Sequence, residues 1–349
     1  MANCKGCGIT LQYDDPSAPG YTPKKDSEYC QRCFRLMHYD DLTVSMRKGI
    51  DPDTVLDRIA SMNALVLWVV DLFDFEASLI PSLNRRINTD DIIMVAAKRD
   101  ILPDTLNHEK VARFVFARLK EEGIHIKGLI LTSRLHGQGV QEIKDAVNMY
   151  AHGRDVVVMG RANAGKSTLL NNMLGKTLLT SSRYPGTTLD FNRLEIDGQT
   201  YIDTPGIEIT GSILMDVREE DLKTILPART IKPQIYQVNR DQSFIIGGLA
   251  RFDVLGCDHA TAVFYLSDGL GIHRCKADHA QELFEKHYGE LFVPVPLQKK
   301  FRTVSSGKHM AKMDVVIGGL GWMCVSGQMD GVRVMAPDDV NVTFRKAML

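Results

Sequence analysis

The octapeptide GRANAGKS at positions 160–167 constrains the fold of this chain more than any other stretch. It follows the apolar run 155–159, which is rich in β-branched valine, and precedes a helix-like pattern that begins at Thr168. A strand, a glycine-bounded loop and a helix, in that order, form the context of a phosphate-binding loop. The glycines let several backbone N–H groups point at one anion, and the helix adds the positive end of its dipole. We therefore expect a phosphate site on an α/β sheet.

Each residue of this loop has an expected role in binding a nucleoside triphosphate. Lys166 reaches the β- and γ-phosphates, and the Ser167 hydroxyl holds Mg²⁺. The other expected contacts of the loop to the nucleotide come from Gly160, Asn163, Ala164, Gly165 and Thr168. A glycine-rich turn without a ligand is the alternative, and the strand and helix on either side argue against it.

The composition is that of a globular protein with two or three domains, since 44% of its 349 residues are hydrophobic and 24% are charged. Its net charge is −1, so any nucleic-acid contact requires a local basic patch. The first residues lack the apolar core of a signal peptide, and the most apolar run, 64–70, is too short to span a bilayer. We expect a cytoplasmic monomer without a membrane partner.

Four of the seven cysteines form two C-x-x-C pairs near the start of the chain: Cys4, Cys7, Cys30 and Cys33. Each pair can form a tight turn that presents two thiolates to one tetrahedral Zn²⁺. The segment is small and polar, so the metal would supply its folding energy. A redox dithiol is the alternative for either pair alone.

Basic residues interleaved with aromatic ones surround these cysteines: Lys5, Lys24, Lys25, Arg32 and Arg35, with Tyr21, Tyr29, Phe34 and Tyr39. Such a surface suits contact with an RNA backbone and stacking on bases. A solvated basic face over a small aromatic core is the alternative.

Apolar strands alternate with helices between the cysteines and the phosphate-binding loop. This alternation predicts a parallel sheet covered on both faces, with ligands at the carboxyl ends of its strands. The expected strands are 64–70, 91–96 and 127–131, and the expected helices are 51–59, 108–121 and 140–150.

Two of these strands end in polar segments that resemble the base-reading elements of GTPases. There, an N-K-x-D tetrapeptide binds guanine through its Asp and packs its Lys stem on the ring, and a second turn supports the base. AKRD at 97–100 places Lys98 and Asp100 in these roles, and the next strand end offers Ser133 and Arg134. Ala97 replaces the usual Asn, which leaves an adenine-nucleotide enzyme as an alternative.

The segments after the phosphate-binding loop supply the remaining phosphate contacts. In YPGTTLD at 184–190, a threonine hydroxyl can complete Mg²⁺ coordination beside the γ-phosphate; we assign Thr188, with Thr187 second. DTPG at 203–206 follows a strand, so Asp203 is expected near Mg²⁺ through a water and the Gly206 N–H on the γ-phosphate.

The base-reading elements precede the phosphate elements, whereas a conventional GTPase runs the other way. This order indicates a circular permutation, and it resembles the permuted GTPases of bacterial ribosome assembly. With cysteine knuckles in front, and with VDLFDF at 70–75 and PGTTLD at 185–190, the chain looks most like the YqeH family of small-subunit biogenesis GTPases.

That resemblance implies an α/β fold: a circularly permuted P-loop GTPase domain at 49–212, with a doubly wound, mostly parallel sheet. It also implies a zinc-binding module at 1–48 and a β-rich α+β domain at 213–349 that binds RNA or the ribosome. The implied ligands are GTP or GDP, Mg²⁺ and Zn²⁺. The implied function is a GTP-hydrolysing switch in assembly of the 30S subunit, with 16S rRNA as a partner.

Catalysis is expected to be slow without a partner. Ile207 stands where many GTPases carry a water-orienting Gln, and an apolar side chain cannot position water. Asn163 matches relatives that bind K⁺ beside the phosphates, although a turn residue is the alternative. We expect Mg²⁺-dependent hydrolysis stimulated by K⁺ and by the ribosome, with Lys166, Asn163, Thr188 and Gly206 as the catalytic residues.

The last third of the chain has mostly strand-like patterns. IGGL occurs at 246–249 and again at 317–320, which suggests two related β-units. We expect a further strand at 291–296 and a basic surface at 299–302. A packed or protein-docking domain is the alternative to RNA binding, and a zinc-containing RNA-binding factor with a static nucleotide is the alternative to a switch.

Overall fold

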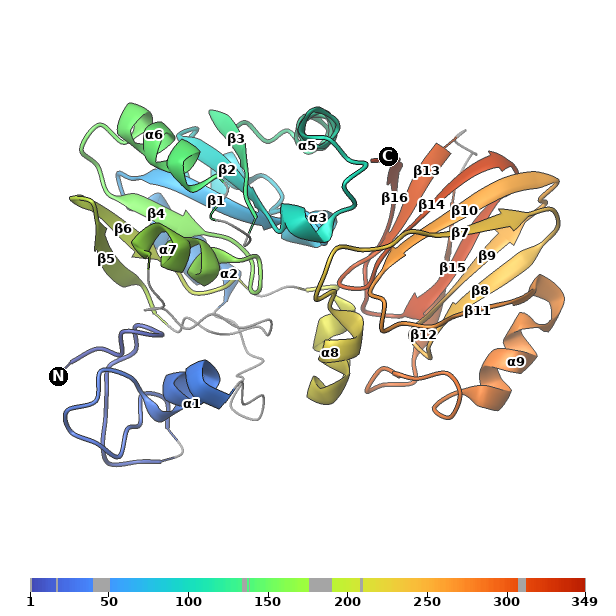
Figure 1. Ribbon diagram of the computed structural model, residues 1–349, viewed down its shortest axis with the longest axis horizontal. Helices are drawn as coiled ribbons and strands as arrows, with labels where there is room; N and C mark the ends of the chain where they lie inside the picture. The colour runs from blue at the N-terminus through green and yellow to red at the C-terminus, as the bar shows by residue number, and fades with distance from the viewer. Residues whose placement is uncertain are drawn as a thin grey trace. The chain divides into compact units, whose positions relative to one another are not determined.

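The chain divides into two compact units, Met1–Asp100 with Ala112–Ile209, and Ile101–Val111 with Thr210–Leu349 (Figure 1). The structure is a computed structural model that describes residues 2–16, 18–39, 51–133, 137, 139–175, 190–207, 210–306 and 312–348, with the backbone alone for 36–39.

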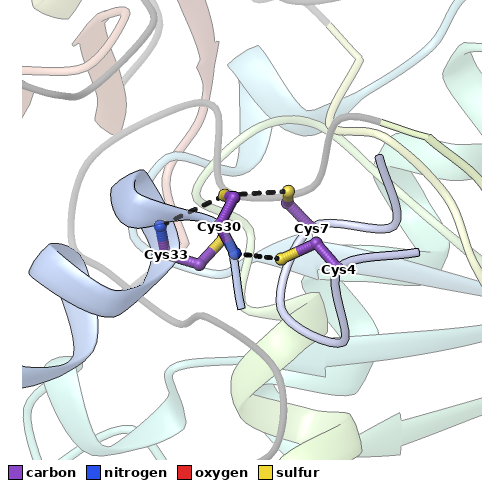
Figure 2. A group of neighbouring side chains, drawn as sticks. All are labelled: Cys4, Cys7, Cys30 and Cys33. Atoms are coloured by element: carbon purple, nitrogen blue, oxygen red, sulfur yellow. Dashed lines mark hydrogen bonds between the residues drawn. The ribbon is translucent and has the colours of Figure 1, made fainter. Parts of the chain in front are cut away.

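The first unit begins with a small module in which the four paired cysteines form most of the core (Figure 2). Two short β-bridges, Asn3 to Thr10 and Gln12 to Tyr21, tie its loops together, and helix α1 (Gln31–Tyr39) follows Cys30. Leu11 is buried beside the sulfurs, with Ile9 and Tyr29 packed against the cluster. A core this small requires a further source of stability.

A six-stranded sheet in the order β3-β2-β1-β4-β6-β5 forms the centre of the same unit, and every neighbouring pair is parallel except β5 with β6. The strands are β1 Leu65–Asp71, β2 Ile92–Ala97, β3 Gly128–Leu131, β4 Val156–Met159, β5 Asn192–Ile196 and β6 Gln199–Asp203. The helices are α2 Pro52–Ala60, α3 Phe75–Ser78, α4 Leu83–Arg86, α5 His108–Glu121, α6 Val140–Tyr150 and α7 Lys166–Leu174, with a 3₁₀ turn η2 at Arg99–Ile101.

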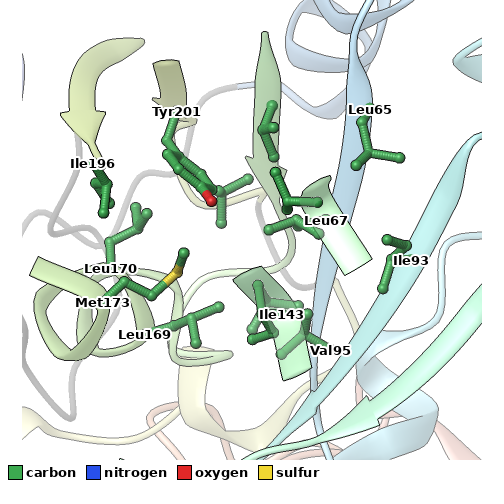
Figure 3. Close-up of a cluster of buried hydrophobic side chains, with 14 of the residues drawn as sticks. Leu65, Leu67, Ile93, Val95, Ile143, Leu169, Leu170, Met173, Ile196 and Tyr201 are labelled. Atoms are coloured by element: carbon green, nitrogen blue, oxygen red, sulfur yellow. The ribbon is translucent and has the colours of Figure 1, made fainter. Parts of the chain in front are cut away.

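Alternate residues of the central strands face helices α6 and α7. Leu65, Leu67 and Val69 of β1 lie in one buried cluster with residues of β2 and β4, together with Ile143 of α6 and Leu170 of α7 (Figure 3). All seven residues of β1 are buried, as a strand covered on both faces requires.

The sheet confirms the circular permutation. Strand β4, which leads into the phosphate-binding loop, is the fourth strand along the chain but lies between β1 and β6. The strands that end in the predicted base-reading segments, β2 and β3, precede β4 in sequence and lie beyond β1. The predicted α/β fold with a mostly parallel sheet is therefore correct.

The second unit contains two five-stranded antiparallel sheets, β16-β13-β14-β10-β7 and β11-β8-β9-β15-β12. Its strands are β7 Gln234–Val238, β8 Gln242–Ile246, β9 Ala250–Leu255, β10 His259–Leu266, β11 Ile272–Lys276, β12 Phe301–Ser305, β13 Lys312–Ile317, β14 Gly321–Gln328, β15 Gly331–Pro337 and β16 Val342–Lys346. Its helical segments are η3 Ile213–Met215, η4 Glu219–Asp221, α8 Leu222–Ile225, η5 Ala277–His279 and α9 Ala280–His287.

The strand pairing of this unit repeats after five strands. Strands β7–β11 pair as β7 with β10 and β8 with both β9 and β11; strands β12–β16 pair as β12 with β15 and β13 with both β14 and β16. The two IGGL sequences occupy equivalent turns, β8 to β9 and β13 to β14. The repeat noticed in the sequence thus coincides with a duplicated topology, in which each half contributes strands to both sheets.

The duplication extends to buried polar groups. Ser243 donates a hydrogen bond to Asp253 across β8 and β9, and Asp314 lies opposite Cys324 on the equivalent rung of β13 and β14. Arg251 donates to Asp253 and Arg345 to Asp314, so each buried carboxylate has a guanidinium partner. This pairing lets both sheets bury a charge in their interiors.

Candidate functional site

The phosphate-binding loop has the backbone that its glycines predict. Gly160 (φ 151°) and Gly165 (φ 109°) lie in the region that favours glycine, and a Cβ on Gly160 would lie 2.2 Å from the carbonyl oxygen of Val69. Asn163 has φ 62°, a left-handed conformation that asparagine tolerates better than most residues. Helix α7 starts at Lys166, directly after the loop.

Lys166 is folded back into the loop. Its Nζ donates to the carbonyl oxygens of Gly160 at 3.1 Å and Arg161 at 3.2 Å. Burial lowers the pKa of the Lys166 ammonium to about 8, while the charge of Asp203 opposes that shift. A phosphate in the loop would give this buried cation a stronger partner than two carbonyl oxygens.

The DTPG segment lies directly against the phosphate-binding loop. Asp203 pairs with Val158 near the carboxyl end of β4 and is fully buried. Its charge acts on the ammonium of Lys166, so it lies beside the phosphate-binding loop. The Ala162 N–H donates to the Ile207 carbonyl at 3.0 Å, and the Ile207 N–H donates to the Gly160 carbonyl at 3.2 Å. The segment after Gly206 thus forms a short ladder with the loop.

The tetrapeptide at 97–100, predicted to read the base, also meets this loop. A Cβ built on Gly165 would lie 3.4 Å from the Cβ of Ala97, so the end of β2 packs against the second glycine of the loop. A hydrogen bond joins this segment to the end of β3, since the Arg99 N–H donates to the Thr132 carbonyl at 3.0 Å. The structure therefore gathers segments from three strand ends around the loop.

Within that group, Lys98 has a left-handed backbone (φ 61°) and its Nζ donates to Asp71 Oδ2 at 2.6 Å. Ser133 is buried, and Asp100 lies in the 3₁₀ turn that follows Lys98. Asp71 was not assigned a role from the sequence. Asp71 stands at the end of β1, and β1 lies between β4 and β2. An acidic residue at this strand end is the sequence signal that could have marked it as a partner of Lys98.

Three predicted site residues lie outside the described residues: Thr187 and Thr188 of the threonine loop, and Arg134 after β3. Thr168 follows Ser167 in the first turn of α7, and Ala164 is buried in the loop.

The four paired cysteines form a second site. One sulfur from each of Cys4, Cys7, Cys30 and Cys33 lies within 4.8 Å of the others, all four are buried, and all are free thiols (Figure 2). The sulfurs of Cys7 and Cys30 are 3.8 Å apart. Tetrahedral zinc with bonds of about 2.3 Å holds its sulfurs about 3.8 Å apart, so the donor set and its spacing fit Zn²⁺.

Backbone N–H groups support the sulfurs as well. The Cys30 N–H donates to the Cys4 sulfur at 3.2 Å, and the Cys33 N–H donates to the Cys30 sulfur at 3.5 Å. Hydrogen bonds of this kind stabilise thiolates, the form that binds a metal. The module contacts the segment that leads into β5, where the Asp190 N–H donates to the Cys7 carbonyl at 3.2 Å.

The basic patch predicted around the cysteines is only partly present. Lys24, Lys25 and Arg35 are exposed, but Arg32 is buried and Lys5 pairs with Glu28. A buried guanidinium and a neutralised ammonium leave a smaller basic surface than the sequence suggested.

Comparison with known proteins identifies the family. The family described as YqeH-like, C-terminal matches residues 259–348, and the family described as 50S ribosome-binding GTPase matches residues 155–240. The YqeH protein of Bacillus subtilis (strain 168) is 35% identical, and the match covers 99% of this chain and 99% of that protein. The chain belongs to the YqeH family. Its nucleotide domain is a GTPase domain, and the chain is a GTP-hydrolysing enzyme whose ligands are GTP, GDP and Mg²⁺.

Plant proteins also match over most of this chain. NO-associated protein 1, chloroplastic/mitochondrial, of Arabidopsis thaliana is 25% identical over 97% of this chain and 72% of its own length. Among solved structures, GNP-bound YlqF from T. maritima is 21% identical over 41% of this chain and 52% of that one, with a TM-score of 0.28, which is too low to support an argument. Among the described residues, no helix has the length and apolarity needed to cross a membrane.

Proposed function

We propose that this YqeH-family GTPase is a switch that acts in assembly of the small ribosomal subunit. The observation that carries the proposal is the packing of Ala97 against Gly165, which brings the base-reading segment beside the phosphate-binding loop in a permuted chain. The motif order resembles that of permuted GTPases of ribosome assembly, and this resemblance supports a ribosomal partner. Assembly of this kind takes place in the cytoplasm, where a monomer would act.

The proposed nucleotide contacts follow from the geometry of the loop. Lys166 and the backbone N–H groups of the loop bind the phosphates, and Ser167 with Asp203 orients Mg²⁺, which supplies charge neutralisation when bound. Gly206 offers its N–H to the γ-phosphate, and Thr188 completes the Mg²⁺ site. Asp100 accepts hydrogen bonds from guanine while Lys98 packs on the ring; Ser133 and Arg134 close the other side of the base.

Potassium is part of the proposal. Ile207 cannot orient water, so additional positive charge near the phosphates would compensate. We assign Asn163 of the loop to hold a monovalent cation there. Hydrolysis is expected to be several-fold faster in KCl than in NaCl at equal ionic strength. Equal rates in the two salts would remove K⁺ from the proposal and leave Asn163 as a turn residue.

The chain's other parts have proposed roles in recognition. We assign the zinc module to 1–48, the GTPase domain to 49–212 and the β-rich domain to 213–349. In the β-rich domain, exposed Lys299, Lys300 and Arg302 suit contact with rRNA, although Lys300 also pairs with Asp338 at 3.6 Å. Zinc holds the first module together, as its four-sulfur site requires.

The decisive test measures GTP hydrolysis with and without purified 30S and 50S particles. A switch requires turnover that 30S particles stimulate at least tenfold and that Lys166→Ala abolishes. Stimulation by 50S particles alone would move the partner to the large subunit. Tight binding of nucleotide and of 30S particles without turnover would instead support a factor with a static nucleotide, which is the second candidate.

A further inference from the structure

Asp71 at the end of β1 is fixed through both of its carboxylate oxygens. Oδ2 accepts the ammonium of Lys98 at 2.6 Å, and Oδ1 accepts the N–H of Phe73 at 2.9 Å. Its own N–H donates to the hydroxyl of Ser78 at 3.1 Å. The Asp71 side chain is 10% exposed and that of Lys98 is 25% exposed, so the ion pair is partly shielded from water.

The backbone around Lys98 is held on both sides. The Leu72 N–H donates to the Ala97 carbonyl at 3.1 Å, and the Arg99 N–H donates to the Thr132 carbonyl at 3.0 Å. Lys98 itself has φ 61°, a conformation that residues with a Cβ seldom adopt and that occurs mainly where the surrounding structure enforces it. The Asp71 carboxylate thus restrains the ammonium end of Lys98, while the neighbouring hydrogen bonds restrain its backbone.

We propose that Asp71 is a positioning residue for the nucleotide base. By holding the ammonium of Lys98, it fixes the methylene stem in the place where the stem packs on the purine ring. A side chain fixed before binding loses less conformational entropy when the ligand arrives. In this chain Ala97 lacks the amide that would tie the tetrapeptide to its surroundings, so the ion pair at the neighbouring residue takes on that role. The inference rests on the proposed base-reading role of Lys98 and Asp100.

The test compares dissociation constants for GDP in a double-mutant cycle. Asp71→Asn keeps the shape and an acceptor for the Phe73 N–H but removes the charge; Lys98→Met keeps the stem but removes the ammonium. Each is expected to weaken GDP binding about fivefold to tenfold, and the double variant no more than twofold beyond Lys98→Met. Lys98→Arg, which preserves the ion pair, should stay within threefold of the wild type.

The matched control is Asp91→Asn. Asp91 pairs with Arg154 at 2.8 Å just before β2 begins, at the other end of that strand. Asp91→Asn should leave the GDP dissociation constant within twofold of the wild type, even if it changes the unfolding midpoint. A loss of affinity equal to that of Asp71→Asn would show that any broken ion pair in this sheet weakens binding, and would overturn the inference.

Further outcomes separate this inference from the base-site proposal. If Asp100→Ala leaves GDP binding unchanged, the base-reading segment is misassigned. If Asp100→Ala weakens binding but Lys98→Met does not, only the role of the ion pair is wrong; this holds even where Asp71→Asn fails to fold. If Asp71→Asn weakens binding as much in the Lys98→Met background as alone, Asp71 acts through the strand end and not through Lys98.

Discussion

The proposed phosphate half and the proposed base half of the nucleotide site are built in different ways. In the phosphate half, backbone geometry dominates: Gly160, Gly165 and Gly206 all stand where a Cβ would be strained or would contact a neighbour within 3.4 Å. In the base half, side chains dominate, and one expected amide is replaced by Ala97. A site that binds through backbone N–H groups restricts which residues can occupy it, so it leaves a strong sequence signal. A site that binds through side chains can replace one contact by another, so its sequence can differ from the usual motif.

The largest expected effect tests the phosphate half. Lys166→Ala should reduce GTP hydrolysis by about 1000-fold or more, because it removes the cation that we assign to the transferred phosphate. The unfolding midpoint should be no lower than that of the wild type, because burial lowers the pKa of Lys166 and its charge therefore does not stabilise the fold. Hydrolysis rates and thermal unfolding check both parts. A lower unfolding midpoint with the hydrolysis rate retained would contradict this account of Lys166.

Gly206→Ala should have the next largest effect. A Cβ there would lie 2.9 Å from the Cα of Ala162, so it would push the DTPG segment away from the phosphate-binding loop. We expect hydrolysis to fall about 100-fold while GDP binding changes less than threefold, because the Gly206 N–H is assigned to the γ-phosphate. Gly128→Ala is the control, since a Cβ on Gly128 meets no atom within 4 Å. An equal loss of binding affinity for GDP and for GTP would argue against a contact between the Gly206 N–H and the γ-phosphate.

Ala97→Asn sharpens the comparison by restoring the missing amide of the base half. One added hydrogen bond is worth about 1 kcal/mol, so GDP should bind about fivefold tighter. ADP binding should not change. Ala97→Leu, of nearly the same size but without an amide, serves as the control and should weaken GDP binding through crowding near Gly165. No gain from Asn over Leu would mean that the base half does not need this contact.

The smallest effect on nucleotide binding is expected from the zinc site. Cys4→Ser should remove the bound zinc and make the N-terminal module sensitive to protease, since the metal supplies much of its stability. GDP affinity should stay within threefold, because the sheet has its own core. Cys275→Ser, outside the cluster, should keep the full zinc content. Metal analysis and limited proteolysis measure both variants; retained zinc in Cys4→Ser would exclude the four-sulfur site.

Helices and strands could be predicted from the sequence where the pattern of apolar residues matches the pattern of buried positions. Helices at 108–121 and 140–150 have the predicted bounds, and the buried strands β1, β2 and β4 differ from prediction by about one residue. The predicted strand at 291–296 is wrong, because prolines interrupt that segment and remove ladder donors. Edge strands β11 and β12 were missed, because their mixed polar residues show no burial pattern.

The candidate site was predictable to a different degree in its two halves. Motif spacing predicted that Lys166 and Asp203 lie around one loop, and the structure brings their charges together there. The ion pair of Asp71 with Lys98 was not predicted, since the two residues lie 27 positions apart and only the pairing of β1 with β2 brings them together. Sequence spacing carries information about local loops, whereas contacts between strand ends depend on the folded sheet.

The most direct test of the permuted pocket is the base preference of Asp100→Asn. An asparagine amide offers one donor and one acceptor, which match the carbonyl and ring N–H of xanthine but not the two donors of guanine. We predict that hydrolysis switches from GTP to XTP, with GTP falling about 100-fold, and that adding Lys166→Ala abolishes the XTP activity. If the variant still prefers GTP over XTP, Asp100 does not read the base, and the segments at 97–100 and 160–167 do not form one nucleotide pocket.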